Sequence, residues 1–340
     1  MKRFAVVFGM AALLSVQGWG AERSGTASLA GDSAATFQPG ARVLMDAHNC
    51  YPYGEWWGDR IERALSAGTP LAIEQDLYWY TDAHTGRSWS VVTHGEPVSG
   101  QEPTLESYFF AHVRPVVEQA LRSGDRKDWP LITLNLDLKT EEPAHLAAIR
   151  KMLEAHEDWI TWAERGTDVR RMEPLHVRPI LVLTGESDAQ QAGFYDSVPV
   201  GGKLLVFGAA HTNTQEKMAA PEVLEPAAGD NYRRWWNNPW GVVEAGGQTK
   251  AGEWTEADTA RLKALVQHAH AHHLWIRFYT LDGAAKKELS CNGWFGGYNF
   301  GSEEAAALRW RAAAAAGVDY IASDQYEKLA AMLAALRGAK

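Results

Sequence analysis

Three strand-like runs in the first third of the chain each end in polar, chemically reactive side chains. The runs cover residues 43–49, 71–77 and 90–95. A helix-like run at residues 59–65, closed by Gly68, joins the first two, so the pattern predicts strand, helix, strand. Parallel α/β folds place their active sites at the carboxyl ends of their strands. This stretch therefore constrains both the fold and the position of a site.

The rest of the chain continues the alternation of strands and helices. Further strands are predicted at residues 131–139, 178–184, 203–208, 274–280 and 318–324, and further helices at residues 104–121, 143–156, from Thr255 onward, 303–316 and 325–336. Residues 209–252 form a long region that we expect to be irregular. Eight strands separated mostly by helices predict an α/β fold of the (β/α)8 TIM-barrel type, with long loops at the carboxyl ends of the strands.

The length of the chain suits one such barrel. A barrel needs about 250 residues, and the chain has 340 without a linker that would separate two domains. We therefore predict a single barrel domain over residues 41–340. The alternative is a doubly wound open sheet, which carries a Gly-rich phosphate loop after its first strand. Here that position holds His48, Asn49 and Cys50, which favours the barrel.

The first 40 residues have the pattern of an export signal followed by a leader. Two basic residues precede a short apolar run at residues 4–16, and small residues follow up to Ala21. This predicts a signal peptide at residues 1–21 and a flexible leader at residues 22–40, and hence a periplasmic or secreted protein. A retained, membrane-anchored N-terminus is the alternative, although the apolar run is too short for a permanent transmembrane helix.

The net charge limits the kinds of binding partner, and the cysteine content bears on disulfide formation. The formal net charge is −9, which argues against a nucleic-acid-binding surface. We expect a monomer with no transmembrane anchor once the signal is cleaved. The two cysteines, Cys50 and Cys291, fall in loops expected on the same face of the barrel. They could pair in an oxidising compartment, and the sequence leaves that pairing open.

Acidic side chains gather on the second and fourth predicted strands. Glu74 and Asp76 are two residues apart, so both point to one face of their strand. Asp137 and Lys139 repeat this spacing on the fourth strand. Two acids on one side repel each other, and a hard divalent cation resolves that repulsion. Asp137 would be the third carboxylate, and Lys139 a fixed positive charge for a phosphoryl oxygen. The alternative is a set of buried salt bridges.

Two histidines end strands in the same region. His48 ends the first predicted strand and His94 the third. Imidazoles titrate near neutral pH, so two of them can act as base and acid in one displacement. Either histidine alone could be structural, but a pair at matching strand ends favours catalysis.

These segments resemble the motifs of a known enzyme superfamily. The match rests on Ala47-His48-Asn49, Ile73-Glu74-Gln75-Asp76, Val92-Thr93-His94-Gly95, Leu136-Asp137-Leu138-Lys139 and the last-strand segment from Gly317 to Asp324. The chain is similar to the phosphatidylinositol-phospholipase-C-like phosphodiesterases, in the branch of the glycerophosphodiester phosphodiesterases and sphingomyelinases D. Glu102-Pro103-Thr104-Leu105 looks closest to a group named after a yeast protein for altered inheritance of mitochondria.

The resemblance implies a TIM-barrel phosphoric diester hydrolase, glycerophosphodiesterase-like or phospholipase-like, acting on a small phosphodiester or a lipid headgroup. The matching positions would supply the metal ligands Glu74, Asp76 and Asp137 for Mg²⁺ or Ca²⁺, and the catalytic residues His48 (base), His94 (acid) and Lys139. Glycerophosphodiester phosphodiesterases usually have Arg directly after the first His. This chain has Asn49 there, so the bidentate phosphate contact of an arginine is missing.

Aromatic residues cluster in segments expected at the carboxyl ends of strands. Trp79 follows the second strand and Trp294 the seventh, where such side chains can contact a choline-like cation, a lipid or a sugar. Arg277 and Tyr279 alternate on the seventh strand and could face the barrel. These four and Asn49 are our candidate substrate-binding residues. The alternative for the tryptophans is that long loops use them as small cores.

A second pair of histidines, His268 and His272, lies one helical turn apart and could bind a metal. They close the helix before the seventh strand, at its amino end and away from the predicted site. We therefore expect them at the surface, where cations favour a helix C-terminus.

Two other functions stay open. A glycoside hydrolase barrel needs two carboxylates on different strands beside the substrate. Glu74 and Asp137 could supply them, but His48, His94 and Lys139 would then have no role. A non-catalytic ligand-binding barrel should show a broken site, yet all six expected polar residues are present.

Overall fold

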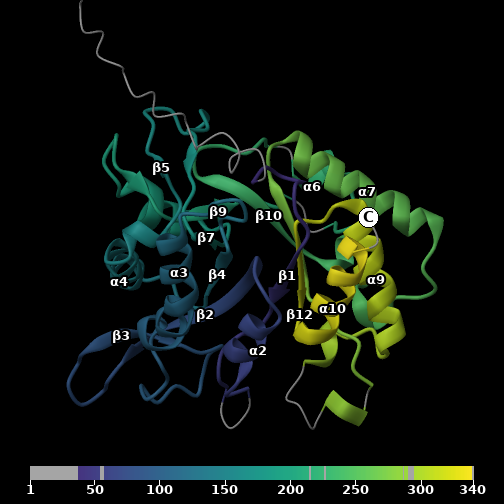
Figure 1. Ribbon diagram of the computed structural model, residues 1–340, viewed down its shortest axis with the longest axis horizontal. Coiled ribbons are helices and arrows are strands. Elements are labelled where there is room, and N and C mark those ends of the chain that lie inside the picture. The colour runs from purple at the N-terminus through teal and green to yellow at the C-terminus, as the bar shows by residue number, and fades with distance from the viewer. Residues whose placement is uncertain are drawn as a thin grey trace, which may run out of the picture.

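The computed structural model describes residues 37–53, 57–213, 216–225, 227–285, 287–289 and 295–338. Eight parallel strands in this part of the chain close into a barrel (Figure 1), because β1 pairs with β12 on one side and with β2 on the other. In order around the barrel they are β1 (Leu44–Ala47), β2 (Leu71–Thr81), β4 (Ile132–Leu138), β7 (Ile180–Thr184), β9 (Phe207–Ala209), β10 (Arg233–Pro239), β11 (Trp275–Tyr279) and β12 (Tyr320–Ser323). The predicted TIM barrel is confirmed.

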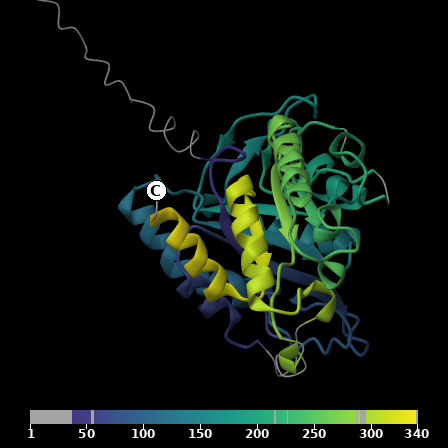
Figure 2. The same ribbon diagram turned by 90° about the vertical axis from the view of Figure 1, so that its right-hand side faces the viewer.

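Helices cover the outside of the barrel. They are α2 (Arg60–Ser66), α3 (Ala111–Ser123), α4 (Pro143–Glu154), α5 (Asp188–Gln191), α6 (Pro221–Leu224), α7 (Glu256–Ala271), α9 (Glu303–Ala316) and α10 (Tyr326–Gly338). The π-helical turns are η1 (Glu106–Phe110) and η3 (Ala192–Asp196), and the 3₁₀ turns are η2 (Glu157–Trp159), η4 (Trp240–Val242), η5 (Gln248–Lys250) and η6 (Gly296–Tyr298). Helices α7, α9 and α10 lie side by side (Figure 2).

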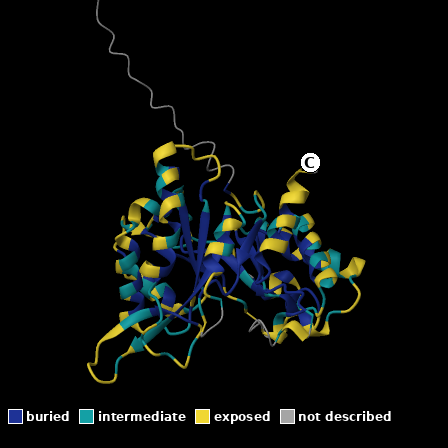
Figure 3. Ribbon diagram, turned by 60° about the horizontal axis from the view of Figure 1, so that its bottom comes forward, coloured by how far each residue is buried: buried dark blue, intermediate teal, exposed yellow. Residues whose placement is uncertain are grey.

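The strands are buried on both faces, as parallel strands covered by helices must be. All five residues of β7 and all four of β12 are buried, and Figure 3 shows the barrel wall buried while the outer faces of the helices are exposed. Leu, Ile and Val make up the first four residues of β7, which is why the sequence predicts this strand well.

The third predicted strand is not part of the barrel. Residues Ser88–Val92 form β3, which pairs antiparallel with β2 and extends it as a hairpin (Figure 1). Only residues 82–87 connect the two strands, and a parallel crossover needs a dozen residues or more. Our assignment of this run to the barrel was therefore wrong, although the run does bring His94 close to Asp76 on β2, because the backbone of Thr93 bonds to that of Asp76.

The barrel strand that the prediction missed is β10, which lies in the region expected to be irregular. Its sequence contains two arginines and a proline, and such a run does not resemble a buried strand. The arginines are buried because their charges are solvated by protein oxygens. Arg233 donates to the carbonyls of Ala209 and Glu186 at 2.6 and 3.0 Å, and Arg234 donates to the carbonyl of Glu173 at 2.8 Å.

The predicted strand at residues 203–208 is divided between two sheets. Its first part is β8 (Lys203–Leu204), which joins β5 (Trp162–Glu164) and β6 (Leu175–His176) in a small antiparallel sheet. Its last part begins the barrel strand β9. One apolar run therefore serves two sheets.

Three further expectations concern the signal peptide, the two cysteines and transmembrane helices. The predicted signal peptide at residues 1–21 lies outside the described residues. Cys50 is buried with a free thiol, whereas Cys291 lies outside the described residues. Within the part of the chain that the structure describes, no helix has the length and apolar character needed to cross a membrane.

Candidate active site

A cavity of about 580 Å³ opens at the carboxyl ends of the barrel strands. Its lining includes all six residues predicted to bind a metal or to act in catalysis, namely His48, Glu74, Asp76, His94, Asp137 and Lys139. They arrive from β1, β2, β3 and β4 or from the residues directly after these strands. The structure therefore brings the predicted constellation together in one place.

The register of two neighbouring strands gathers the three carboxylates. Glu74 and Asp76 alternate on β2, and Asp76 lies directly opposite Asp137 on β4. One oxygen atom from each of the three side chains lies within 4.8 Å of the others. Glu74 and Asp76 are buried, while the Asp137 side chain is 47% exposed. Such a cluster of oxygen ligands on a partly open face suits a hard divalent cation.

The Asp76 carboxylate has one oxygen atom with partners and one without. Its Oδ2 lies 3.0 Å from the Tyr51 hydroxyl and 2.9 Å from the Lys139 ammonium group. Its Oδ1 is buried with no hydrogen-bond partner. Burial raises the pKa of Asp76 well above its ordinary value, Asp137 and Glu74 raise it further, and Lys139 opposes them. A buried carboxylate oxygen without a hydrogen-bond partner, in a cluster of negatively charged groups, is suited to coordinate a cation.

Lys139 is fixed between two of the carboxylates. Its Nζ lies 2.9 Å from Asp76 and 2.8 Å from Asp137. Burial would lower the pKa of Lys139, but the two carboxylates outweigh it and raise the pKa above its ordinary value. The amine therefore stays charged, and part of that charge already neutralises the acidic cluster.

The His48 imidazole is oriented by a residue that the prediction did not name. Nδ1 of His48 lies 2.8 Å from Oδ1 of Asp324, and Nε2 lies 3.9 Å from Oε1 of Glu74. Burial alone would lower the pKa of His48, but Glu74 and Asp324 outweigh it and raise the pKa to about 9. With Nδ1 committed to Asp324, Nε2 is the nitrogen available for chemistry.

Asp324 is itself held firmly as an anion. Arg60 lies 3.4 Å from its Oδ1, and the Asn49 amide donates to it at 3.3 Å. Burial would raise the pKa of Asp324, but Arg60 and His48 lower it to about 2. The last-strand motif includes Asp324 in the sequence, and that was the signal available, but nothing in the spacing showed that it would meet His48.

His94 lies two residues after β3, on the more open side of the cavity. The backbone amide of Thr93 donates to the Asp76 carbonyl at 3.0 Å and fixes the end of the hairpin against β2. The Tyr53 ring lies edge-on to the imidazole at 6.3 Å. Partial desolvation, together with the charge of Lys139, lowers the pKa of His94. Its environment thus shifts its pKa in the opposite direction from that of His48.

Arg277 lines the cavity, but acidic residues already occupy its guanidinium group. It is buried and forms ion pairs with Asp46 on β1 and Glu74 on β2, and it donates to Asn237 Oδ1 at 3.1 Å. Burial would lower the pKa of Arg277, and the two carboxylates raise it above its ordinary value. Its observed contacts fix Glu74, while the predicted substrate contact stays a prediction. Asp46, two residues before His48, is a partner that sequence reasoning missed.

Of the other predicted substrate-binding residues, some line the cavity and others do not. Asn49 and Tyr279 line the cavity, but the Asn49 amide is already engaged, by Asp324 through Nδ2 and by the Tyr51 hydroxyl at 2.6 Å. Trp79 is not among the cavity-lining residues, and its ring stacks on His145 with a centroid separation of 5.3 Å. Trp294 lies outside the described residues.

Structures similar to this chain include two phosphodiesterases and a phospholipase C. A glycerophosphoryl diester phosphodiesterase from Parabacteroides distasonis has 14% sequence identity and a TM-score of 0.43, with 87% of each chain covered. A second enzyme of that species, a glycerophosphodiester phosphodiesterase, has 12% identity and a TM-score of 0.43, with 87% of this chain and 98% of the other covered.

The third similar structure is a calcium-dependent phosphoinositol-specific phospholipase C from a Pseudomonas species. It has 13% identity and a TM-score of 0.48, with 85% of this chain and 91% of the other covered. No protein-family model and no curated protein matches the sequence.

Proposed function

We propose that this protein is a metal-dependent phosphoric diester hydrolase. The observation that carries the proposal is the carboxylate cluster of Glu74, Asp76 and Asp137, with its orphaned Asp76 oxygen, in one cavity with two imidazoles and an ammonium group. Each group has a task in the transfer of a phosphoryl group from an alkoxide to water, and the six lie within a single cavity.

The three carboxylates are the residues that would hold the cation. Their ligand atoms are oxygens only, which favours Mg²⁺ or Ca²⁺ over metals that prefer nitrogen or sulfur. When bound, the cation would neutralise a non-bridging phosphoryl oxygen and the excess negative charge of the cluster. Arg277 would keep Glu74 oriented for this task, because its guanidinium group forms ion pairs with both Glu74 and Asp46.

His48 would be the general base. Asp324 holds Nδ1–H, so the lone pair of a neutral imidazole is on Nε2, the nitrogen on the side of Glu74. There it can accept a proton from water or from a neighbouring hydroxyl group of the substrate. Because Glu74 contributes to the raised pKa of His48, positive charge that neutralises Glu74 would bring the pKa of His48 back toward neutrality.

His94 would be the general acid. It approaches the cavity from the β2–β3 hairpin, whereas His48 comes from β1, so the two imidazoles reach the substrate from different strands. A protonated His94 can give its proton to the leaving alkoxide. Attack by water would give the monoester directly, and attack by an internal hydroxyl group would give a cyclic phosphate first.

Lys139 would stabilise negative charge that develops on the phosphoryl group. Its side chain is 20% exposed, so the ammonium group can contact a substrate oxygen while it stays bound to Asp76 and Asp137. Charge placed in advance in a partly desolvated site lowers the barrier more than the same charge in water.

The arrangement supports a glycoside hydrolase less well. Such an enzyme needs one free carboxylate as acid and a second as nucleophile or base. Here Arg277 holds Glu74, and Lys139 bridges Asp76 and Asp137. A carboxylic acid with a raised pKa is present in Asp76, but no second, unpaired carboxylate faces it among the described lining residues.

Export belongs to the same proposal. The basic and apolar pattern of residues 1–21 supports a periplasmic or secreted enzyme that acts as a monomer on a small phosphodiester or a lipid headgroup. Mass spectrometry of the protein recovered from the periplasm or the medium would show a chain that begins near residue 22. An intact N-terminus in a membrane fraction would contradict export with cleavage.

The reaction class can be tested with a panel of diesters followed by ³¹P NMR. The panel would contain glycerophosphocholine, glycerophosphoinositol and a phosphoinositide in detergent, each incubated with the purified chain and Mg²⁺ or Ca²⁺. We expect a phosphomonoester or a cyclic phosphate from at least one of them. Binding of the cation by calorimetry without any product would instead support a non-catalytic barrel.

A further inference from the structure

A second cluster of metal-ligating side chains lies on the outside of the barrel. It consists of Glu225, directly after α6, and of His268 and His272 at the end of α7. The prediction placed these two histidines at the surface, and that was wrong. Both are partly buried, with side chains 8% and 28% exposed, and Glu225 between them is 0% exposed.

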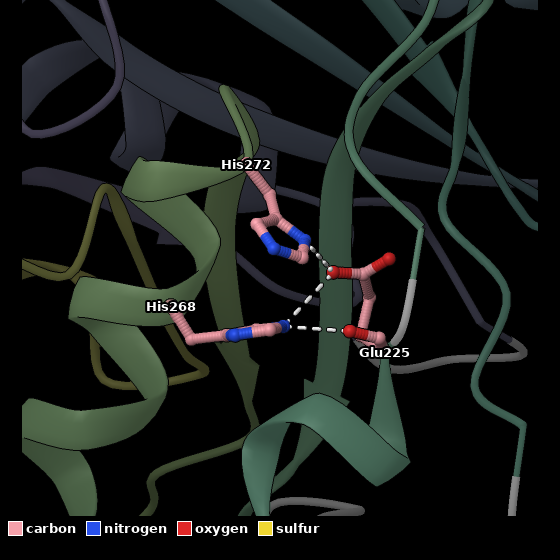
Figure 4. Close-up of side chains that lie close together, drawn as sticks. All are labelled: Glu225, His268 and His272. Carbon is pink, nitrogen blue, oxygen red and sulfur yellow. Dashed lines mark hydrogen bonds and ion pairs between the residues drawn. The ribbon is translucent and has the colours of Figure 1, made fainter.

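The ligand atoms of the cluster converge on a single point (Figure 4). Nε2 of His268 lies 3.2 Å and Nδ1 of His272 lies 2.9 Å from the same oxygen, Oε2 of Glu225. Nε2 of His268 also lies 2.6 Å from the Glu225 carbonyl oxygen. The imidazole centroids are 4.1 Å apart, since the spacing of four residues stacks the two rings one turn apart.

The cluster is separated from the catalytic cavity by the barrel wall. Side chains alternate along β10, so Trp235 and Asn237 line the cavity while Trp236 points outward. The Trp236 ring lies edge-on to His268 at 6.0 Å. His268 therefore packs against the outer face of β10, and the low exposure of His268 and Glu225 shows that most water is excluded there.

The buried Glu225 carboxylate presents one of its oxygen atoms to both histidines. Glu225 Oε1 accepts from the backbone amide of Ala227 at 2.8 Å, which leaves Oε2 for the histidines. In the part of the chain that the structure describes, the only ion pairs of Glu225 are those with His268 and His272. A fully buried carboxylate is costly unless it is paired or coordinates a metal.

We propose that Glu225, His268 and His272 form a binding site for a divalent transition-metal ion of the zinc type. Two imidazole nitrogens and a carboxylate oxygen are ligands of zinc and unlike the all-oxygen cluster of the cavity. Ligand atoms about 2.0–2.2 Å from a tetrahedral ion are roughly 3.4 Å from each other, close to the 3.2 and 2.9 Å observed here. Coordination would release to solvent the hydrogens that the histidines now share with Glu225.

The ion would fix two connections of the barrel to each other. Glu225 belongs to the segment between β9 and β10, and the histidines end the helix that leads into β11. The fourth coordination position would be open to water or would take the Glu225 carbonyl oxygen. An ion here would stabilise the wall of the barrel beside β10 without entering the catalytic cavity.

The test is a zinc titration of the full chain by calorimetry, with Mg²⁺ in excess to saturate the carboxylate cluster. The wild type is compared with two variants of the cluster, His268→Ala/His272→Ala and Glu225→Gln, which retains the size of the side chain. His270→Ala is the matched control, because His270 lies on the same helix but pairs with Asp319 at 2.9 Å. Thermal unfolding of each protein with and without Zn²⁺ measures how far binding of the ion raises the melting temperature.

We expect one tight zinc site per chain in the wild type and in His270→Ala, with a rise in melting temperature when Zn²⁺ is added. The affinity should fall roughly 100-fold or more in the double variant and in Glu225→Gln, because even partners outside the coordination shell change metal affinity 10–100-fold. Co²⁺ in place of Zn²⁺ should give the visible absorption of a site with nitrogen ligands. Zinc binding and stabilisation that persist unchanged in Glu225→Gln and in the double variant would overturn the proposal.

Discussion

Nδ1 of His48 lies 2.8 Å from Oδ1 of Asp324, and both side chains are buried. The two residues come from β1 and from the end of β12, the strands at which the barrel closes. Closure of the barrel therefore assembles this pair, and the imidazole is oriented by a carboxylate from the other end of the sequence. Any change that misplaces β12 against β1 should also misplace the base.

Asp324→Asn tests whether Asp324 positions His48. The amide can hydrogen-bond to Nδ1 but supplies no negative charge and does not fix the tautomer, as in the Ser-His-Asp triad, where the same exchange costs about 10⁴-fold in kcat. We expect kcat for diester hydrolysis to fall between roughly 10² and 10⁴-fold with little change in KM. Asp319→Asn, at the amino end of the same strand, is the control and should keep its kcat. Equal losses in both variants would mean that the effect is structural.

Asp76→Asn tests the cation site without reference to turnover. In the wild type, Mg²⁺ or Ca²⁺ should raise the melting temperature, because a ligand that binds only the folded state stabilises it by about 2.7 kcal/mol at a concentration 100 times its Kd. The neutral amide should abolish most of that rise. Asp168→Asn, which removes an exposed carboxylate bound to Arg170, should respond like the wild type. A rise of equal size in Asp76→Asn would show that the ion binds elsewhere.

Arg277→Gln separates a structural arginine from a substrate contact. The substitution leaves the buried carboxylates of Asp46 and Glu74 without their partner, and loss of one member of a buried ion pair costs about 3–5 kcal/mol. Urea unfolding should report a loss of this size. Arg63→Gln, which breaks the exposed pair with Glu327, should cost less than about 1 kcal/mol. If Arg277→Gln unfolds like the wild type and only KM rises, the arginine serves the substrate alone.

The metal-free protein should lose stability as the pH rises. The pKa of His48 is about 9 in the folded chain and near 6.5 ordinarily. A raised folded-state pKa contributes stability that is complete below about pH 6.5 and is lost as the pH rises through about 9. The difference in unfolding free energy is up to about 3 kcal/mol. Urea unfolding in EDTA should show this decrease in unfolding free energy in the wild type and not in His48→Gln. A flat difference between the two proteins across this range would contradict the pairing.

The barrel was predictable because several of its strands can be recognised from their own local sequence. The strand β7 is an apolar run that ends in Thr184, β4 alternates apolar and polar residues strictly, and β2 begins with the apolar run Leu71-Ala72-Ile73. The spacing of Glu74 and Asp76, and its repetition at Asp137 and Lys139, fixes which side chains share a face. This regularity places four of the six polar residues, whereas His48 and His94 were predicted from their positions at the ends of strand-like runs and from the resemblance to known motifs.

The parts that could not be predicted depend on contacts between distant residues. The strand β10 looks irregular because its arginines are solvated by carbonyl oxygens of other segments, and nothing local shows that they will be. The pairing of Arg277 with Asp46 and Glu74 is of the same kind. The partly buried histidines of α7 could be recognised only once Glu225, from a different loop, was in place.

The most direct test of the proposed function is the hydrolysis of bis(p-nitrophenyl) phosphate by the purified chain with Mg²⁺, with Ca²⁺ and with EDTA. Wild-type protein is compared with His48→Ala, which removes the base, and Glu74→Ala, which removes a cation ligand. We predict hydrolysis that needs the cation and is lost in both variants. Hydrolysis that continues in EDTA, or that survives in both variants, would contradict a metal-dependent diester hydrolase at this site.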